Sequence, residues 1–83
     1  MKVKLNGKTL EGSPVEILQG LMERAFFLRE DMDVYNYLEA LKDNARRFFG
    51  EELNITGNTV EEKAESAIRE MARIGMLKII EED

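Results

Sequence analysis

The sequence predicts a small α+β domain in which a short sheet is covered by helices on one side. The first ten residues alternate apolar and polar side chains around an Asn-Gly dipeptide, which is typical of a β-hairpin. Three later segments repeat apolar residues at the period of an amphipathic helix, and two short segments alternate as strands do. Because such helices and strands must bury their apolar faces against each other, we expect the order ββααβαβ.

The hairpin is predicted for residues 1–11, with Asn6 and Gly7 as a two-residue loop. The favoured turn needs a positive φ at both loop residues, which asparagine and glycine accept more readily than other residues. This register places Val3 opposite Leu10, on one face of the sheet. That face is expected to rest on the core.

The first helix is predicted for residues 14–28. Ser13 suits the N-cap position, Pro14 suits the first helical position, and Glu16 stands where the second member of a capping box is required. The apolar residues that follow fall on one broad helical face. We therefore expect this helix to lie on the sheet.

The second helix is predicted for residues 34–49. Its apolar stripe extends to Phe48 and Phe49, which we expect to face the core. Gly50 follows directly, at the position where a helix commonly ends in a left-handed residue.

The remaining elements are a strand at 52–56, a third helix at 60–74 and a final strand at 76–80. Leu53 and Ile55 alternate with polar residues, so both are expected to point inward from the first of these strands. The third helix begins with a second capping box and ends at a glycine. Together the elements form one domain, residues 1–83.

Composition excludes several kinds of site. The chain has no cysteine and no histidine, which removes disulfides, thiolate ligands and the commonest metal ligand, so we expect no metal and no cofactor. No apolar run is long enough to span a membrane, and no targeting segment is recognised, so a cytoplasmic protein without a membrane partner is expected. The net charge of −5 disfavours a nucleic-acid partner.

Catalysis is not expected either. The tripeptide Gly7-Lys8-Thr9 resembles the end of a phosphate-binding loop, but Lys2 stands where that motif needs its first glycine, and no helix begins at Lys8. Acidic residues occur as adjacent pairs, which point in different directions and rarely converge on one reacting atom. We therefore predict a non-enzymatic protein that binds another macromolecule, either a protein partner or a second copy in a homodimer.

The predicted partner surface consists of three aromatic residues. Phe27 does not fit the apolar face of the first helix, and Tyr35 and Tyr37 flank the stripe of the second. Exposed side by side, the three would form an aromatic patch of the kind that marks contact surfaces. The alternative for Phe27 is that the helix ends before it and the ring turns back into the core.

Two charged surfaces provide alternatives. Glu61, Glu62 and Glu65 could make the protein an acidic decoy from a phage or mobile element, which would occupy the nucleic-acid-binding groove of a host protein. The second alternative is weak DNA binding, which would use a basic surface instead of an acidic one.

That basic surface would consist of Lys42, Arg46 and Arg47 on the second helix. Its simpler interpretation is that the arginines complement the dipole at the end of the helix. Acidic residues on the same polar surface would repel phosphate.

Three stretches of the chain, KVKLNGKTLEGSPVEIL, YLEALKDNARRFFG and NTVEEKAESAIREMARIGML, carry a resemblance. Together they are similar to a group of short uncharacterised bacterial and prophage proteins. The likeness lies in caps, turns and core positions, and not in a reactive motif. It implies a cytoplasmic bacterial or phage origin, and it implies no particular activity.

Overall fold

The computed structural model describes residues 1–24 and 33–81, and it confirms the predicted α+β class. This part of the chain forms a three-stranded antiparallel sheet and three α-helices, the second of which continues into a π-helical turn. In chain order the elements are β1 (Lys2–Leu5), β2 (Lys8–Glu11), α1 (Pro14–Arg24), α2 (Val34–Asn44), the π-helical turn η1 (Ala45–Phe49), α3 (Val60–Ile74) and β3 (Lys78–Glu81).

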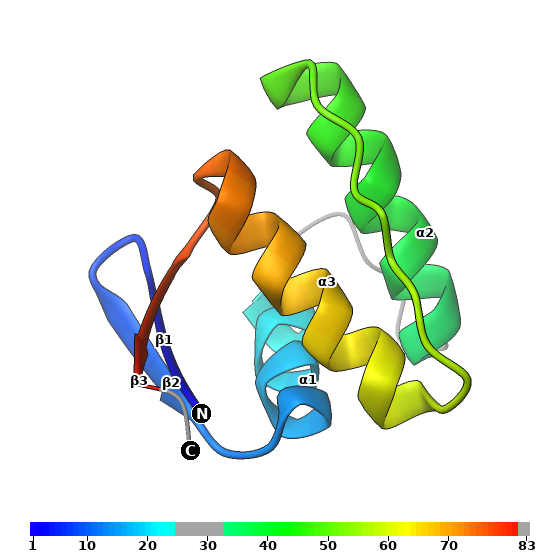
Figure 1. The fold of residues 1–83 in the computed structure, drawn as a ribbon. Helices are drawn as coiled ribbons and strands as arrows, with labels where there is room; N and C mark the ends of the chain where they lie inside the picture. The colour runs from blue at the N-terminus through cyan, green and yellow to red at the C-terminus, as the bar shows by residue number, and fades with distance from the viewer. Residues whose placement is uncertain (25–32, 82–83) are drawn as a thin grey trace.

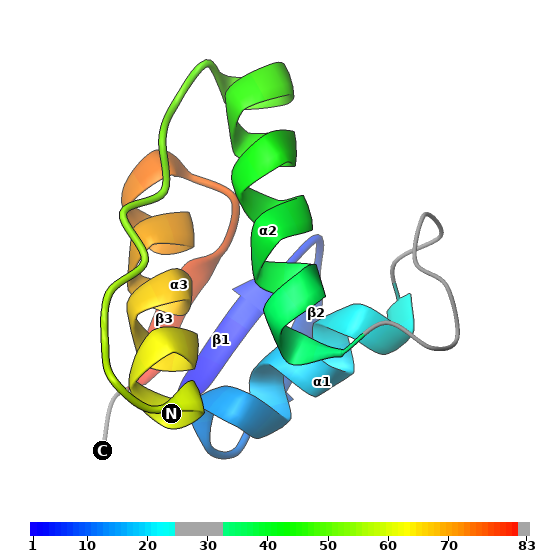
Figure 2. The ribbon, with the colours of Figure 1, turned by 90° about the vertical axis from the view of Figure 1, so that its right-hand side faces the viewer.

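The elements are arranged in three layers (Figure 1). The sheet, in the order β2-β1-β3, forms the first layer, and α1 and α3 lie together against one of its faces. The third layer is α2, which packs on α3 from the side away from the sheet (Figure 2). The other face of the sheet is not covered by any described helix.

The hairpin forms as the sequence predicts. Asn6 has a φ of 50° and Gly7 a φ of 81°, so both loop residues adopt the left-handed conformation that a tight hairpin requires. Val3 pairs with Leu10, in the predicted register. β3 pairs with the other edge of β1, which places Val3 at the centre of the sheet and buries it fully.

The uncovered face and the edge of β3 have two unusual features. Lys4 lies directly opposite Lys78 across the β1–β3 pair, although like charges at such positions repel. The pairing also shifts register between Lys2 and Val3, so Ile80 is passed over and forms a bulge. β3 begins two residues later than the predicted strand at 76–80, because Met76 belongs to the turn that follows α3.

Both predicted N-caps are present, and the one at Ser13 is a complete capping box. The Glu16 amide donates to the Ser13 hydroxyl (3.2 Å), and the Ser13 amide donates to the Glu16 carboxylate (3.1 Å). The bond from the Ser13 amide, and next the bond from its hydroxyl, lower the pKa of Glu16. At the start of α3, the Glu62 amide donates to the Thr59 hydroxyl (3.1 Å). These local bonds explain why α3 has the bounds that the sequence predicts.

The predicted strand at 52–56 is not formed. Residues 51–57, called the strap below, run between α2 and α3 and pair with no strand. The strap lies on the far side of α3 from the sheet, so no strand edge is within its reach (Figures 1 and 2). The alternating pattern correctly placed Leu53 inward, where only 5% of it is exposed, but the backbone finds other partners.

Those partners are side chains of α3. Ser66, Glu70 and Arg73 lie four and three residues apart, so they follow one edge of the helix. They satisfy backbone groups that a sheet would otherwise satisfy. The bonds run from the Asn54 amide to the Glu70 carboxylate (2.9 Å), from the Thr56 amide to the Ser66 hydroxyl (3.0 Å) and from the Arg73 guanidinium to the Glu52 carbonyl (2.8 Å).

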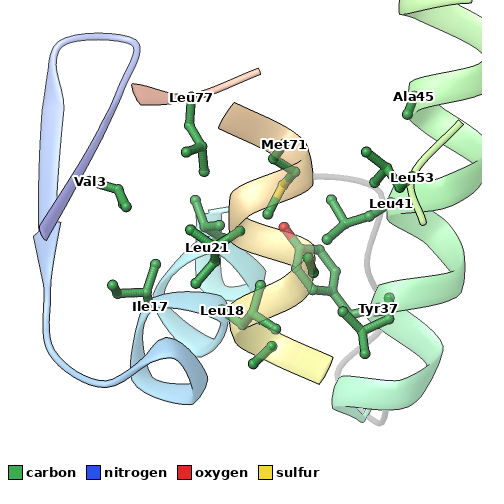
Figure 3. Close-up of a cluster of buried hydrophobic side chains, with 14 residues drawn as sticks. Val3, Ile17, Leu18, Leu21, Tyr37, Leu41, Ala45, Leu53, Met71 and Leu77 are labelled. Carbon is green, nitrogen blue, oxygen red and sulfur yellow. The ribbon is translucent and has the colours of Figure 1, made fainter. Parts of the chain in front are cut away.

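The core lies between the layers (Figure 3). Ile17, Leu18, Ile68 and Met71 are its largest fully buried side chains together with Val3 of the sheet. The core continues through α2 to the strap, whose Leu53 lies beside Leu41 and Ala45 in Figure 3. The described residues leave no buried side-chain nitrogen or oxygen without a hydrogen-bond partner.

Tyr37 belongs to this core, and its burial predicts a loss of stability in alkaline solution. Burial raises the pKa of Tyr37 from 10.0 to about 12. Because the folded chain then holds the phenol proton more tightly than the unfolded chain, the stability is fully present below pH 10 and falls as pH rises toward 12. The whole shift corresponds to roughly 2 to 3 kcal/mol.

We expect Tyr37→Phe to lose less stability than the wild type between these two pH values. Urea unfolding at both ends of the range measures the difference, and Tyr35→Phe, at the exposed tyrosine, is the matched control. Equal losses in Tyr37→Phe and the wild type would contradict the burial of this phenol.

The hydrogen bonds that hold the strap predict how the stability of the fold changes in acid. Hydrogen bonds from Arg73 and from the Asn54 amide lower the pKa of Glu70 below 4.5. A lowered pKa contributes stability that is present above the ordinary value and is lost as pH falls through the folded-state value. Glu70→Gln should therefore be less stable than the wild type at neutral pH, and the difference should shrink in acid.

Glu65→Gln is the control for this measurement, because Glu65 is also an ion-paired carboxylate of α3, with Arg69 at 3.1 Å. Urea unfolding at neutral pH and below pH 4 gives the comparison. A Glu70→Gln variant that matches the wild type at both values would show that this carboxylate does not hold the strap.

Candidate functional site

The structure places the two tyrosines of the predicted aromatic patch in different environments. Tyr35 is exposed over 53% of its surface, and the Lys63 ammonium lies 5.1 Å from the centre of its ring. Only 4% of Tyr37 is exposed, so its prediction as part of a surface patch is wrong. Residues two apart on a helix point to nearly opposite sides, and α3 covers the side of Tyr37. Phe27 lies outside the described residues.

The most exposed aromatic side chain of the described residues, Phe48, lies at the other end of the helix beside Phe49. Phe48 is 76% exposed and Phe49 is 47% exposed, so the prediction that both face the core is wrong. The apolar stripe of α2 ends at Ala45, which is fully buried. From there the helix continues as the π-helical turn η1, whose larger number of residues per turn rotates later side chains away from the stripe.

The position of η1 adds to this exposure. Figure 1 shows the last turn of the helix projecting beyond the layer formed by α1 and α3. Gly50 then reverses the chain with a φ of 67°, and its amide bonds the Ala45 carbonyl. The strap returns from there and brings Leu53 into the core, in the same buried cluster as Ala45. The sequence contains one signal of this exposure. Gly50 ends the helix, so both phenylalanines lie in its terminal turn, which neighbouring helices often do not cover.

Oppositely charged residues adjoin Phe48 and Phe49. We call them the charged belt, and it contains the predicted basic surface of Lys42, Arg46 and Arg47. Each of these cations has a carboxylate partner. The belt's ion pairs are Lys42–Glu39 (3.4 Å), Arg46–Glu52 (3.5 Å), Arg47–Asp43 (3.2 Å) and Arg73–Glu51 (3.9 Å).

The belt is exposed, so its ion pairs contribute little to stability. The pairs also bring cations and carboxylates together on this surface, where Arg73 has a second and nearer carboxylate partner, Glu70, at 3.0 Å. The basic surface that the sequence predicts is therefore balanced by acidic neighbours.

The predicted acidic surface lies at the start of α3. Glu61 is exposed, whereas the Glu62 carboxylate accepts a bond from the hydroxyl of the N-cap residue Thr59 (3.2 Å). Glu65 pairs with Arg69 at 3.1 Å. Two of the three carboxylates thus already have a partner within α3 or at its cap.

Two shallow polar depressions flank the strap. One, of about 450 Å³, lies on the α3 side and includes Ser66 and Glu70, and the other, of about 310 Å³, lies on the α2 side and includes Lys42 and Arg46. Ser66 and Glu70 are both engaged in holding the strap backbone. Their polar atoms therefore have a structural use that competes with binding a ligand.

A third depression of about 200 Å³ lies beside the hairpin and is lined mostly by apolar side chains, among them Leu5, Leu10 and Leu21. Over residues 1–24 and 33–81, no group of three His, Cys, Asp or Glu side chains could hold a metal ion. Over the same residues, every helix is too short or too polar to cross a membrane. The exposed phenylalanines are therefore the feature of the described surface that most needs an explanation.

Comparisons of the chain with protein-family models, with curated proteins and with solved structures found no match. The function must therefore be argued from the geometry itself.

The exposure of Phe48 makes a prediction about stability. Phe48→Ala should change the free energy of unfolding by less than about 0.5 kcal/mol, as is usual for surface positions. Leu41→Ala, which empties a buried position on the same helix, should cost about 2 to 5 kcal/mol. Urea unfolding of both variants tests the assignment, and a similar cost for the two would mean that Phe48 is part of the core.

Proposed function

We propose that the protein is a non-enzymatic binding domain that contacts another protein, or a second copy of itself, through Phe48 and Phe49. The observation that carries this proposal is their exposure at the projecting end of a helix. Large exposed aromatic side chains gain free energy when a partner removes them from water, and aromatic residues are enriched where proteins meet.

The rest of the domain supports this assignment, because folding leaves most of Phe48 and about half of Phe49 exposed to water. The strap closes the core with Leu53, and Ala45 is already fully buried beneath it. A phenylalanine that folding leaves in water gives an isolated domain no benefit from its apolar area. Contact with a partner would give it one, and the cytoplasm is the proposed location of that contact.

Two properties of the surface disfavour the two charged alternatives, nucleic-acid binding and the acidic decoy. A phosphate backbone would have to displace Asp43 from Arg47 and Glu52 from Arg46 before it could meet either arginine. For the acidic decoy, Glu62 and Glu65 would have to leave the partners they have in α3 and at its cap. A protein surface that covers the phenylalanines requires neither exchange.

The test is affinity capture from an extract of the source organism, with and without nuclease, read by mass spectrometry. The proposal expects a protein that survives nuclease and is retained by the wild type and by Tyr35→Ser, but is lost from the double variant Phe48→Ser/Phe49→Ser. The captured protein is then purified and titrated against all three forms by calorimetry. Tyr35→Ser serves as the matched control because it removes an exposed aromatic residue from the opposite end of the helix.

The same experiment separates the alternatives. Partners that disappear with nuclease, and with Arg46→Glu/Arg47→Glu, would favour nucleic-acid binding. A nucleic-acid-binding protein that is lost only from Glu61→Lys/Glu62→Lys/Glu65→Lys would favour the decoy. Equal binding by the wild type and the double phenylalanine variant would contradict the proposed surface.

A further inference from the structure

We propose that the strap is a second binding site, whose edge away from α3 takes an extended peptide segment of another protein as an added strand. This site is separate from Phe48 and Phe49, and its test does not depend on the proposed function. The observation that carries it is that the strap's backbone has hydrogen-bond partners along one edge only.

The bonded edge of the strap faces α3. Its bonds belong to alternate residues, namely the carbonyl of Glu52, the amide and carbonyl of Asn54 and the amide of Thr56. The Asn54 carbonyl accepts from the Ser66 hydroxyl at 3.3 Å. In an extended chain the amide and carbonyl of one residue point to one edge, and those of the next residue point to the other. The alternation therefore shows that the strap is extended, with one edge turned to α3.

The other edge belongs to Leu53 and Ile55 and is turned away from α3. The amides and carbonyls of these two residues make no hydrogen bond within residues 1–24 and 33–81. Unpaired backbone groups are costly where a chain is largely buried, and only 5% of Leu53 is exposed. A row of unpaired donors and acceptors at alternate residues is what an added strand pairs with.

A depression lies along this free edge. It has a volume of about 310 Å³, and its lining includes Leu53 and Ile55 of the strap and Lys42 and Arg46 from the side of α2. Because paired strands lie about 5 Å apart, a peptide bonded to the free edge would lie in this depression. The free edge therefore opens into space and not onto a neighbouring element of the described chain.

The two cations of the depression favour acceptors on the peptide. Lys42 and Arg46 each have one carboxylate neighbour, Glu39 at 3.4 Å and Glu52 at 3.5 Å, in exposed pairs. An ammonium and a guanidinium carry more donors than one such pair uses, so both can also donate to a peptide carbonyl or carboxylate. Arg73 already does this for the strap, whose Glu52 carbonyl it bonds at 2.8 Å. We therefore expect an extended peptide with an acidic side chain toward α2.

The free edge is tested first in the chain alone, by amide hydrogen exchange of the full protein followed by NMR. The Ile55 amide should exchange faster than the amides of Asn54 and Thr56 on either side of it, because only those two have partners. Equal protection of all three amides would overturn the inference, since the edge would then already be occupied.

Binding is tested with a phage-displayed library of random linear peptides, selected on the wild type and titrated by calorimetry. Ile55→Pro removes the free donor and suits an extended backbone, whereas Ile55→Val keeps the donor and is the matched control. Ile55→Pro should weaken binding by about tenfold or more, since a peptide acceptor loses its partner. Ile55→Val and Phe48→Ser/Phe49→Ser should bind as the wild type does. Circular dichroism and urea unfolding establish that the variants are folded.

The peptide tests the same bonds while the protein stays unchanged. Methylating the nitrogens of alternate peptide residues removes the donors from one edge of the peptide. One set of methylated positions should therefore abolish binding, and the set between them should leave it intact. In the complex with the unmethylated peptide, the Ile55 amide should become protected from exchange.

Three results of the binding experiments would overturn the inference. A library that yields no peptide for the wild type overturns it. Peptides that bind Ile55→Pro as tightly as the wild type also overturn it, and if Phe48→Ser/Phe49→Ser loses them, the proposed function survives alone. Equal effects of methylation at both sets of positions would show that the peptide is not bound as a strand.

Discussion

The fold depends on α3, because one side of this helix packs in the core and another side holds the strap. Its small residues Ala64 and Ala67 are fully buried and allow α1, α2 and the sheet to approach it closely. Its polar edge supplies the hydrogen bonds that the strap cannot obtain from a strand. Because the strap carries Leu53 into the core beside α2, this polar edge also determines how the end of α2 is covered, and so which of its side chains meet water.

Features that depend on a few neighbouring residues could be predicted from the sequence. The hairpin, both N-caps and the bounds of α3 follow from bonds and dihedral preferences that span three or four residues. The α+β class followed as well, because amphipathic helices and short strands leave few other ways to bury their apolar faces. The order of the strands was not predictable, since β3 reaches β1 from the other end of the chain.

The predictions that were wrong concern features that depend on residues far away in the sequence. Alternation at Leu53 and Ile55 indicated correctly that the segment has an inner side, but an alternating pattern does not say whether the backbone bonds to a strand or to helix side chains. Burial of Tyr37 and exposure of Phe48 depend on where the covering elements begin and end. A helical wheel contains neither fact, so Tyr37 was predicted at the surface and Phe48 in the core.

The sheet has a consequence for the behaviour of the chain at high concentration. Both of its outer strands offer unpaired backbone groups, and such edges can recruit strands from other molecules into fibrils. Here each edge strand is only four residues long, β3 is interrupted at Ile80, and Lys4 and Lys78 place two positive charges side by side on the open face. A strand added to β3, or a second sheet stacked on that face, would meet this irregularity and this charge. The two lysines therefore oppose aggregation at this face, and their mutual repulsion lowers the stability of the single molecule.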